Sequence, residues 1–114
     1  MRYLENIRKI FPETQKGINS KMKSDKGDAY YSSYSYLNEA YQLTMDFYSL
    51  PERPDIMNID YEVKIGGKRV YFMSSPATRL EEDLPFIKGV AIGKVMEKAS
   101  GIWSLVEDDE ISED

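Results

Sequence analysis

Residues 29–50, AYYSSYSYLNEAYQLTMDFYSL, contain no Gly and no Pro. Asp28 is a suitable N-cap for a helix, and Pro51 would end one. At about 100° per residue, four tyrosines of this segment fall on one narrow strip. The apolar arc is wider than a simple surface helix needs, so we predict that residues 29–50 form one long, central helix.

The four aligned tyrosines permit two interpretations. They could pack in the core with their hydroxyl groups reaching water, as tyrosines commonly do. Four hydroxyls in one core region would each need a hydrogen-bond partner, however, and tyrosine is enriched at protein interfaces. We therefore treat the strip as a candidate interface at the border of the core. Its members are Tyr30, Tyr34, Tyr41 and Tyr48.

A β-hairpin is predicted after the long helix. Residues 57–65 alternate between apolar and polar side chains, which is typical of a half-buried strand. Gly66 and Gly67 suit a two-residue hairpin turn because both tolerate positive φ. A second strand follows over 68–73 and would pack with the first against the long helix. The expected cross-strand pairs are Val63–Val70 and Tyr61–Phe72.

The N-terminal part is predicted to contain a short helix and a loop. Residues 2–11 place Leu4, Ile7 and Phe11 on one face of an amphipathic helix that ends at Pro12. Residues 16–28 are polar, contain two glycines and lack periodicity, which predicts a mobile basic loop.

Residues 85–100 predict a third helix, opened by Pro85, with a strand over 89–95 as the alternative. Two glycines inside a helix each cost up to about 1 kcal/mol relative to alanine. We therefore expect another backbone to approach this helix closely at Gly89 and Gly93. The expected packing strip consists of Gly89, Ile92, Gly93, Met96, Ala99 and Trp103.

These elements predict an α+β fold in the order helix, long helix, β-hairpin, helix. A chain of 114 residues allows one domain, which we assign to residues 1–106. Residues 107–114 are predominantly acidic and predict a disordered tail.

The composition argues against several kinds of chemistry. The chain has no Cys and no His, which excludes disulfides, thiolate nucleophiles, Cys/His zinc sites and histidine-based triads. We expect no metal site, no cofactor and no catalytic residue. The sequence contains no apolar run long enough for a signal peptide or a membrane span. We expect a cytoplasmic location, in the host cell if the protein is viral.

Charged residues suggest two further candidate sites. A basic group near the N-terminus could bind nucleic acid, although it lacks a Walker-type motif and interleaved aromatics. An acidic group could form a surface patch, and a solvated surface is the simpler interpretation of both groups. The basic candidates are Lys16, Lys21, Lys23 and Lys26. The acidic candidates are Asp55, Asp60, Glu62, Glu81, Glu82 and Asp83.

A small acidic chain with a tyrosine strip fits a non-enzymatic protein-interaction module better than an enzyme. We expect an inhibitor or adaptor that docks on a larger macromolecule, with a homodimer possible and no membrane partner. In a sharper version, the acidic surface imitates nucleic-acid phosphates and blocks a nucleic-acid enzyme, as phage anti-restriction and anti-CRISPR proteins do. The alternatives are a nucleic-acid-binding accessory protein that uses the basic N-terminal region, or a viral structural or assembly protein.

Overall fold

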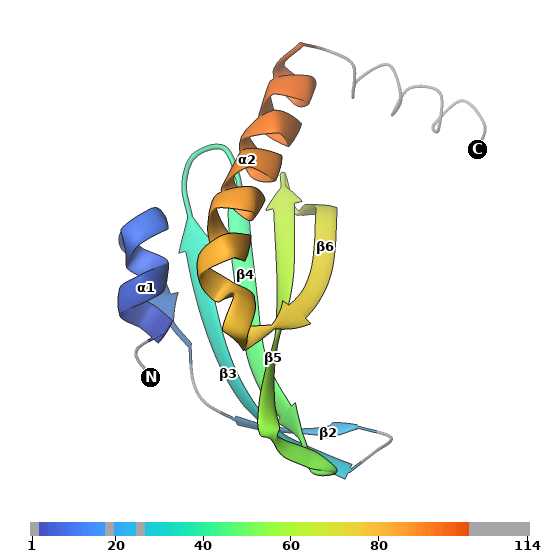
Figure 1. The fold of residues 1–114 in the computed structure, drawn as a ribbon. Coiled ribbons are helices and arrows are strands. Elements are labelled where there is room, and N and C mark those ends of the chain that lie inside the picture. The colour runs from blue at the N-terminus through green and yellow to red at the C-terminus, as the bar shows by residue number, and fades with distance from the viewer. Residues whose placement is uncertain (1–2, 18–19, 25–26, 101–114) are drawn as a thin grey trace, which may run out of the picture.

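The computed structural model describes residues 3–17, 20–24 and 27–100, with side chains left out over 20–24 and 27–31. The chain is mostly an antiparallel sheet in the order β1-β3-β4-β5-β6, and β2 also pairs with β3 (Figure 1). The strands are β1 (Gln15–Lys16), β2 (Ser20–Ser24), β3 (Gly27–Leu37), β4 (Gln42–Leu50), β5 (Arg53–Ile65) and β6 (Lys68–Pro76). The helices are α1 (Tyr3–Ile10), a 3-10 turn (Ala77–Arg79) and α2 (Leu80–Ala99).

Both helices lie on one face of the sheet, and the core fills the space between them and the strands (Figure 1). Strand alternation sends every second side chain of β4 and β5 to this face, which we call the helix face. Phe11 and Ile7 of the N-terminal segment belong to the same core cluster as Phe47 and Tyr61 of the sheet, and all four are fully buried or nearly so. The opposite face of the sheet, called the open face below, carries mainly polar side chains.

The long helix predicted over residues 29–50 is wrong. This segment forms most of β3, a turn at residues 38–41, and β4. Leu43, Met45 and Phe47 are buried on the helix face, whereas the residues between them are partly exposed. That alternation has a period of two, and tyrosine and phenylalanine favour strands, so sheet pairing overrides the helical spacing.

The basic loop predicted over residues 16–28 is also partly wrong, because β2 forms a ladder with β3. Ser20 pairs with Tyr31, and Ser24 pairs with Gly27. A hairpin therefore occupies most of this stretch. Lys26 lies outside the described residues, as do Trp103 and the acidic tail predicted for residues 107–114.

The hairpin predicted after residue 57 is confirmed, but its register is wrong. Gly66 and Gly67 both have positive φ, +59° and +80°, as a two-residue turn between twisted strands requires. A β-bulge then inserts one extra residue into β6, so that each later residue shifts by one. The observed pairs are Val63–Tyr71 and Tyr61–Met73. Phe72 consequently lies on the open face instead of in the core.

The two predicted terminal helices are confirmed, and the strand alternative over 89–95 is wrong. The C-terminal helix α2 begins at Leu80, five residues before the expected start. Its packing face is not the predicted strip, since Leu80, Leu84, Ile87 and Ala91 are the residues buried against the sheet. The described members of the predicted strip, Gly89, Ile92, Gly93, Met96 and Ala99, are exposed instead. Among the described residues, a Cβ added at Gly89 or Gly93 would meet nothing within 4 Å, so no close backbone in this part of the chain explains either glycine.

Among the described residues, no helix has the length and apolar character needed to cross a membrane.

Candidate functional site

The four tyrosines of the predicted strip lie in different environments. Tyr34 and Tyr41 are buried on the helix face, and the Tyr34 ring lies edge-on to Phe47 with centroids 5.0 Å apart. Tyr48 lies on the open face, where its hydroxyl donates to Asp60 Oδ1 at 3.1 Å. Tyr30 pairs with Ser49 in the sheet, and its side chain is not among those described. The sheet therefore separates the tyrosines that a helix would have aligned.

Tyr41 belongs to a turn that is held by one side chain. Asn38 Oδ1 accepts hydrogen bonds from the backbone N–H groups of Ala40 and Tyr41, at 2.7 and 2.8 Å. The same side chain donates from Nδ2 to the Tyr36 hydroxyl at 3.3 Å. This Asx-type turn reverses the chain between β3 and β4 and holds the two tyrosine rings 5.9 Å apart.

The turn faces α2 across a groove of about 300 Å³, which we call the tyrosine groove. The turn and the end of β3 form one side, and the C-terminal half of α2 forms the other. The lining residues are Tyr36, Asn38, Ala40, Tyr41, Lys88, Ile92, Val95 and Met96. The groove is largely apolar, and its polar groups are the two tyrosine hydroxyls, Asn38 and Lys88.

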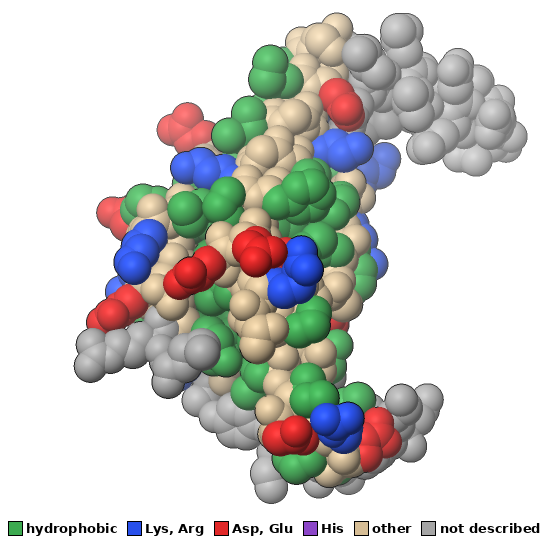
Figure 2. Space-filling view, viewed as in Figure 1, with side chains coloured by type: hydrophobic (Ala, Val, Ile, Leu, Met, Phe, Trp, Pro, Cys, Tyr) green, Lys and Arg blue, Asp and Glu red, His purple; other side chains and the backbone are tan. Residues whose placement is uncertain are grey.

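The helix side of the tyrosine groove is exposed to an extent that is unusual for such residues. Met96 is 65% exposed and Ile92 is 45% exposed, although both are apolar. On the face seen in Figure 2, hydrophobic side chains flank α2 along its length, and charges of both signs gather around its first turns. Two exposed apolar side chains beside a groove make this surface a candidate interaction site.

Two polar groups of the groove, Tyr41 and Lys88, have defined neighbours. Burial raises the pKa of Tyr41 above 10, and the neighbouring Tyr36 hydroxyl raises it further. Tyr41 therefore stays protonated at neutral pH and acts as an uncharged polar group. Lys88 donates to the backbone carbonyl of Ile10 at 3.3 Å and lies 6.0 Å from the Phe11 ring centroid. Lys88 thus places a basic side chain in the lining of the groove.

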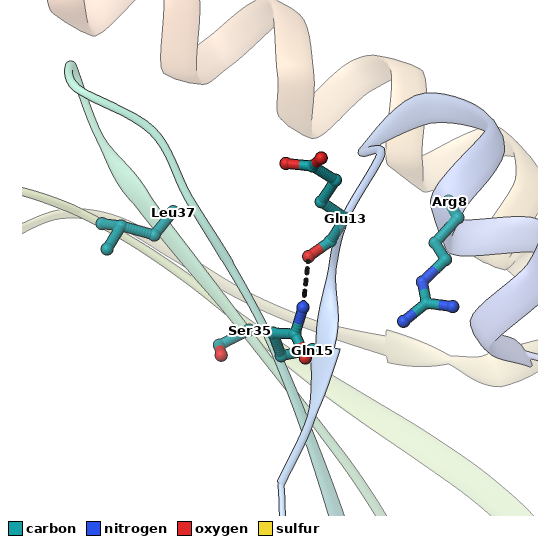
Figure 3. Close-up of a pocket in the computed structure, with 5 residues that line it drawn as sticks. All are labelled: Arg8, Glu13, Gln15, Ser35 and Leu37. Atoms are coloured by element: carbon teal, nitrogen blue, oxygen red, sulfur yellow. Dashed lines mark hydrogen bonds between the residues drawn. The ribbon is translucent and has the colours of Figure 1, made fainter.

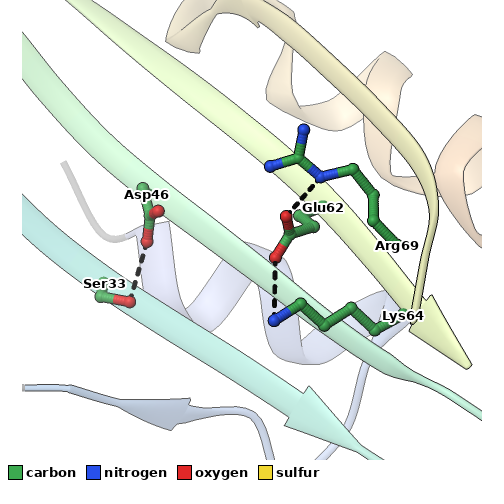
Figure 4. A network of polar contacts seen from close by, with 5 residues as sticks. All are labelled: Ser33, Asp46, Glu62, Lys64 and Arg69. Carbon is green, nitrogen blue, oxygen red and sulfur yellow. Dashed lines mark hydrogen bonds and ion pairs between the residues drawn. The ribbon is translucent and has the colours of Figure 1, made fainter. Parts of the chain in front are cut away.

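The open face contains two of the predicted acidic residues, each with polar partners. Glu62 contacts Arg69 at 2.6 Å and Lys64 at 3.5 Å (Figure 4). Asp60 accepts from the hydroxyl groups of Tyr48 and Ser74. Burial and the Asp60 carboxylate together raise the pKa of Tyr48, so this hydroxyl remains a donor.

The other predicted acidic residues lie elsewhere. Asp55 is exposed near the start of β5, and its side chain contacts Arg53. Glu81, Glu82 and Asp83 lie in the first turn of α2, above the opposite face of the sheet from Glu62. The structure therefore does not bring the six acids together. Within the described residues these acids lie on both faces of the sheet, and several lie beside basic side chains.

Asp83 is the exception among these acids because it is buried. Its Oδ1 lies 3.8 Å from Arg79 Nε, while Oδ2 has no hydrogen-bond partner among the described residues. The buried Tyr61 hydroxyl also lacks a partner in hydrogen-bond geometry within the described part of the chain. Burial, and next the nearby Asp83 charge, raise the pKa of Tyr61 well above 10. The Tyr61 hydroxyl and the Asp83 carboxylate therefore lie in one buried polar region under α2.

A second hollow lies between the α1–β1 connection and the end of β3 (Figure 3). Its volume is about 770 Å³, but its side chains spread apart around open space. Arg8 donates from Nε and Nη2 to the Thr14 carbonyl, at 3.0 and 2.8 Å, so its guanidinium holds the chain turn. We infer a structural role for this cation.

The predicted basic group is only partly described. Lys16 is exposed in β1, opposite Tyr34 of β3. Lys21 and Lys23 lie in β2, opposite Tyr30 and Asp28. Their side chains are not described, and Lys26 lies outside the described residues.

Sequence reasoning missed the tyrosine groove because it placed Tyr41 inside a helix. The helical spacing does single out Ile92 and Met96, but as core residues. Asn38 was the available signal, since Asn between two apolar runs favours a turn.

Within the described ranges, no three Asp or Glu side chains come close enough to hold a metal ion. Comparisons of the chain with protein-family models, curated proteins and solved structures give no match.

Proposed function

We propose that the protein is a non-enzymatic interaction module that binds an apolar segment of a partner protein in the tyrosine groove. The observation that carries this proposal is the exposure of Ile92 and Met96 beside two tyrosine rings. Apolar side chains of this size each gain about 1.5–3 kcal/mol when they are fully removed from water. A partner that covered both residues would gain much of that free energy.

The groove favours a partner of particular chemistry. An amphipathic helix docks in such grooves through apolar side chains at positions i, i+3 or i+4, and i+7. Methionine adapts to irregular apolar surfaces, and tyrosine offers a rigid ring with a polar end. The charge in the lining is that of Lys88. We therefore expect the docking segment to carry an acidic residue at the end that lies next to Lys88.

Selection from a peptide library tests this proposal directly. A displayed library of helical peptides is selected against the immobilised full chain, and the affinity of the selected peptides is measured by calorimetry. We expect convergence on an apolar helical pattern with a flanking acid. Met96→Glu or Ile92→Glu should weaken binding by more than tenfold, since each places a charge on the apolar side.

Leu37→Glu is the matched control, because Leu37 is 74% exposed but does not line the groove. It should leave the peptide affinity unchanged. A synthetic peptide of residues 101–114, whose sequence is GIWSLVEDDEISED, is tested in the same assay because it is also apolar and then acidic. If this peptide binds and Met96→Glu abolishes that binding, the occupant is the chain itself and the proposal fails. Equal losses with Leu37→Glu would also contradict it.

A further inference from the structure

The last strand of the sheet has an unpaired edge. In the described part of the chain, β6 ends the strand order and pairs with β5 alone (Figure 1). Its outer backbone N–H and C=O groups therefore offer a template for another strand. The bulge after Arg69 and the proline at residue 76 limit the regular part of this edge to residues 71–75.

Two exposed aromatic rings flank this edge, one on each face of the sheet. Phe72 is 43% exposed on the open face, where the Arg69 guanidinium lies 4.5 Å from its ring centroid. Phe86 of α2 is 54% exposed on the helix face, and its centroid lies 6.3 Å from that of Tyr71 in β6. Another strand added to β6 would cover part of both rings.

There is also room beside the edge. A groove of about 350 Å³ separates β6 from the first turns of α2. Met73, Ser74 and Ser75 line it from the strand side, and Arg79, Glu82, Asp83 and Phe86 line it from the helix side. Side chains of an added strand that point to the helix face would enter this groove.

The charges at the two ends of the edge have opposite signs. The β5–β6 turn is flanked by Lys64, Lys68 and Arg69, and Glu62 contacts Lys64 and Arg69. At the other end, the first turn of α2 carries Glu81, Glu82 and the buried Asp83, and Arg79 contacts Glu82 at 3.3 Å, so the exposed acids exceed the one Arg by a single charge. An edge that is basic at one end and acidic at the other complements itself when two copies pair antiparallel, because each basic end then meets an acidic end.

We propose that β6 pairs antiparallel with β6 of a second copy, around a two-fold axis close to Met73. Residues 71–75 of the two copies form the new ladder. Lys68 and Arg69 of one copy then lie beside residues 77–78 of the other, next to the acidic first turn of α2. The two sheets join into one, with the helices of both copies on the same face. This interface is separate from the tyrosine groove.

Sedimentation velocity of the full chain over a range of concentrations tests the pairing. We expect a reversible shift from 13.2 kDa to twice that mass. Phe72→Lys should raise the dissociation constant by more than tenfold, because a lysine on an edge strand opposes pairing. Phe72 is partly exposed, so this change does not empty the core. Leu37→Lys makes the same kind of change at an exposed residue of β3 and should leave the mass distribution as in the wild type.

A charge exchange distinguishes this pairing from other dimers. Lys68→Glu alone and Glu82→Lys alone should each weaken the dimer, because each places like charges opposite one another. The double variant should recover the wild-type dissociation constant. Met96→Glu, which blocks the tyrosine groove, should leave dimerisation unchanged. A chain that stays monomeric at millimolar concentration overturns the proposal, and so does a dimer that tolerates Phe72→Lys or is not restored by the double exchange.

Discussion

Three glycine-to-alanine changes test whether α2 presents an open strip to solvent. Gly89 and Gly93 lie inside α2, and an added Cβ would meet nothing within 4 Å at either position. Alanine should therefore gain its full helix preference, about 1 kcal/mol at each site. Gly67 also has free space around its Cβ, but its φ is +80°. Alanine there should cost about 1–2 kcal/mol because the left-handed conformation is unfavourable for residues with a Cβ.

Urea unfolding of the three variants measures these effects. With an m-value of about 1–3 kcal/mol/M, Gly89→Ala and Gly93→Ala should each raise the unfolding midpoint by about 0.3–1 M. The Gly67→Ala midpoint should fall by a similar or larger amount. The three changes add the same methyl group in equally open surroundings. Opposite signs of the change in unfolding free energy can therefore be assigned to the difference in backbone conformation. A loss of stability at Gly89 or Gly93 would refute the assignment of this strip to the surface.

Three further predictions concern the core, a turn and the pH dependence. Phe47→Ala should cost about 3–5 kcal/mol in urea unfolding, whereas Tyr48→Phe, which loses one partly buried hydrogen bond, should cost about 0.5–1.5 kcal/mol. Glu13 has a φ of +66°, so Glu13→Gly should stabilise the protein by about 1 kcal/mol, and a loss would indicate a stabilising role for its carboxylate. The pKa values of Tyr41, Tyr48 and Tyr61 are raised, so the folded state retains protons that the unfolded state releases near pH 10. Stability should therefore fall as the pH rises above 10, and an absorbance titration that shows all tyrosines ionising together at pH 10 without unfolding would contradict this.

The sequence correctly predicted the elements whose residue pattern is compatible with only one type of secondary structure. Residues 57–65 alternate without interruption, and the Gly-Gly turn that follows suits only a tight hairpin. Residues 29–50 permit two interpretations, because Tyr30, Tyr34 and Tyr41 satisfy a helical spacing while Leu43, Met45 and Phe47 alternate. The absence of Gly and Pro favoured the helix. Asn38 marks the turn in the middle of this segment, but one Asn is a weak signal without the strands on both sides.

The register of β6 could not be predicted from its pattern. Val70 and Phe72 are the apolar residues that alternate after the glycine turn, and pairing without a bulge would bury both. The bulge instead sends Tyr71 and Met73 to the helix face, where Tyr71 meets Phe86 of α2. This contact joins Tyr71 to a residue of the following helix, so the local alternation of β6 does not contain it. The same shift exposes Phe72 beside the edge to which we assign dimerisation.

The two proposed surfaces lie on opposite flanks of α2, and this arrangement determines how they combine. The tyrosine groove lies on the β3 side, lined by Lys88, Ile92 and Met96 of the helix. The groove beside the free edge lies on the β6 side, lined by Glu82 and Phe86. Because β3 and β6 are separated by two strands, an antiparallel dimer through β6 leaves both tyrosine grooves uncovered. Such a dimer presents two identical grooves on one face. Once one docking segment of a two-segment partner has bound, its second segment is held near the second groove at a raised effective concentration. Weak binding at each groove would then suffice for a stable complex.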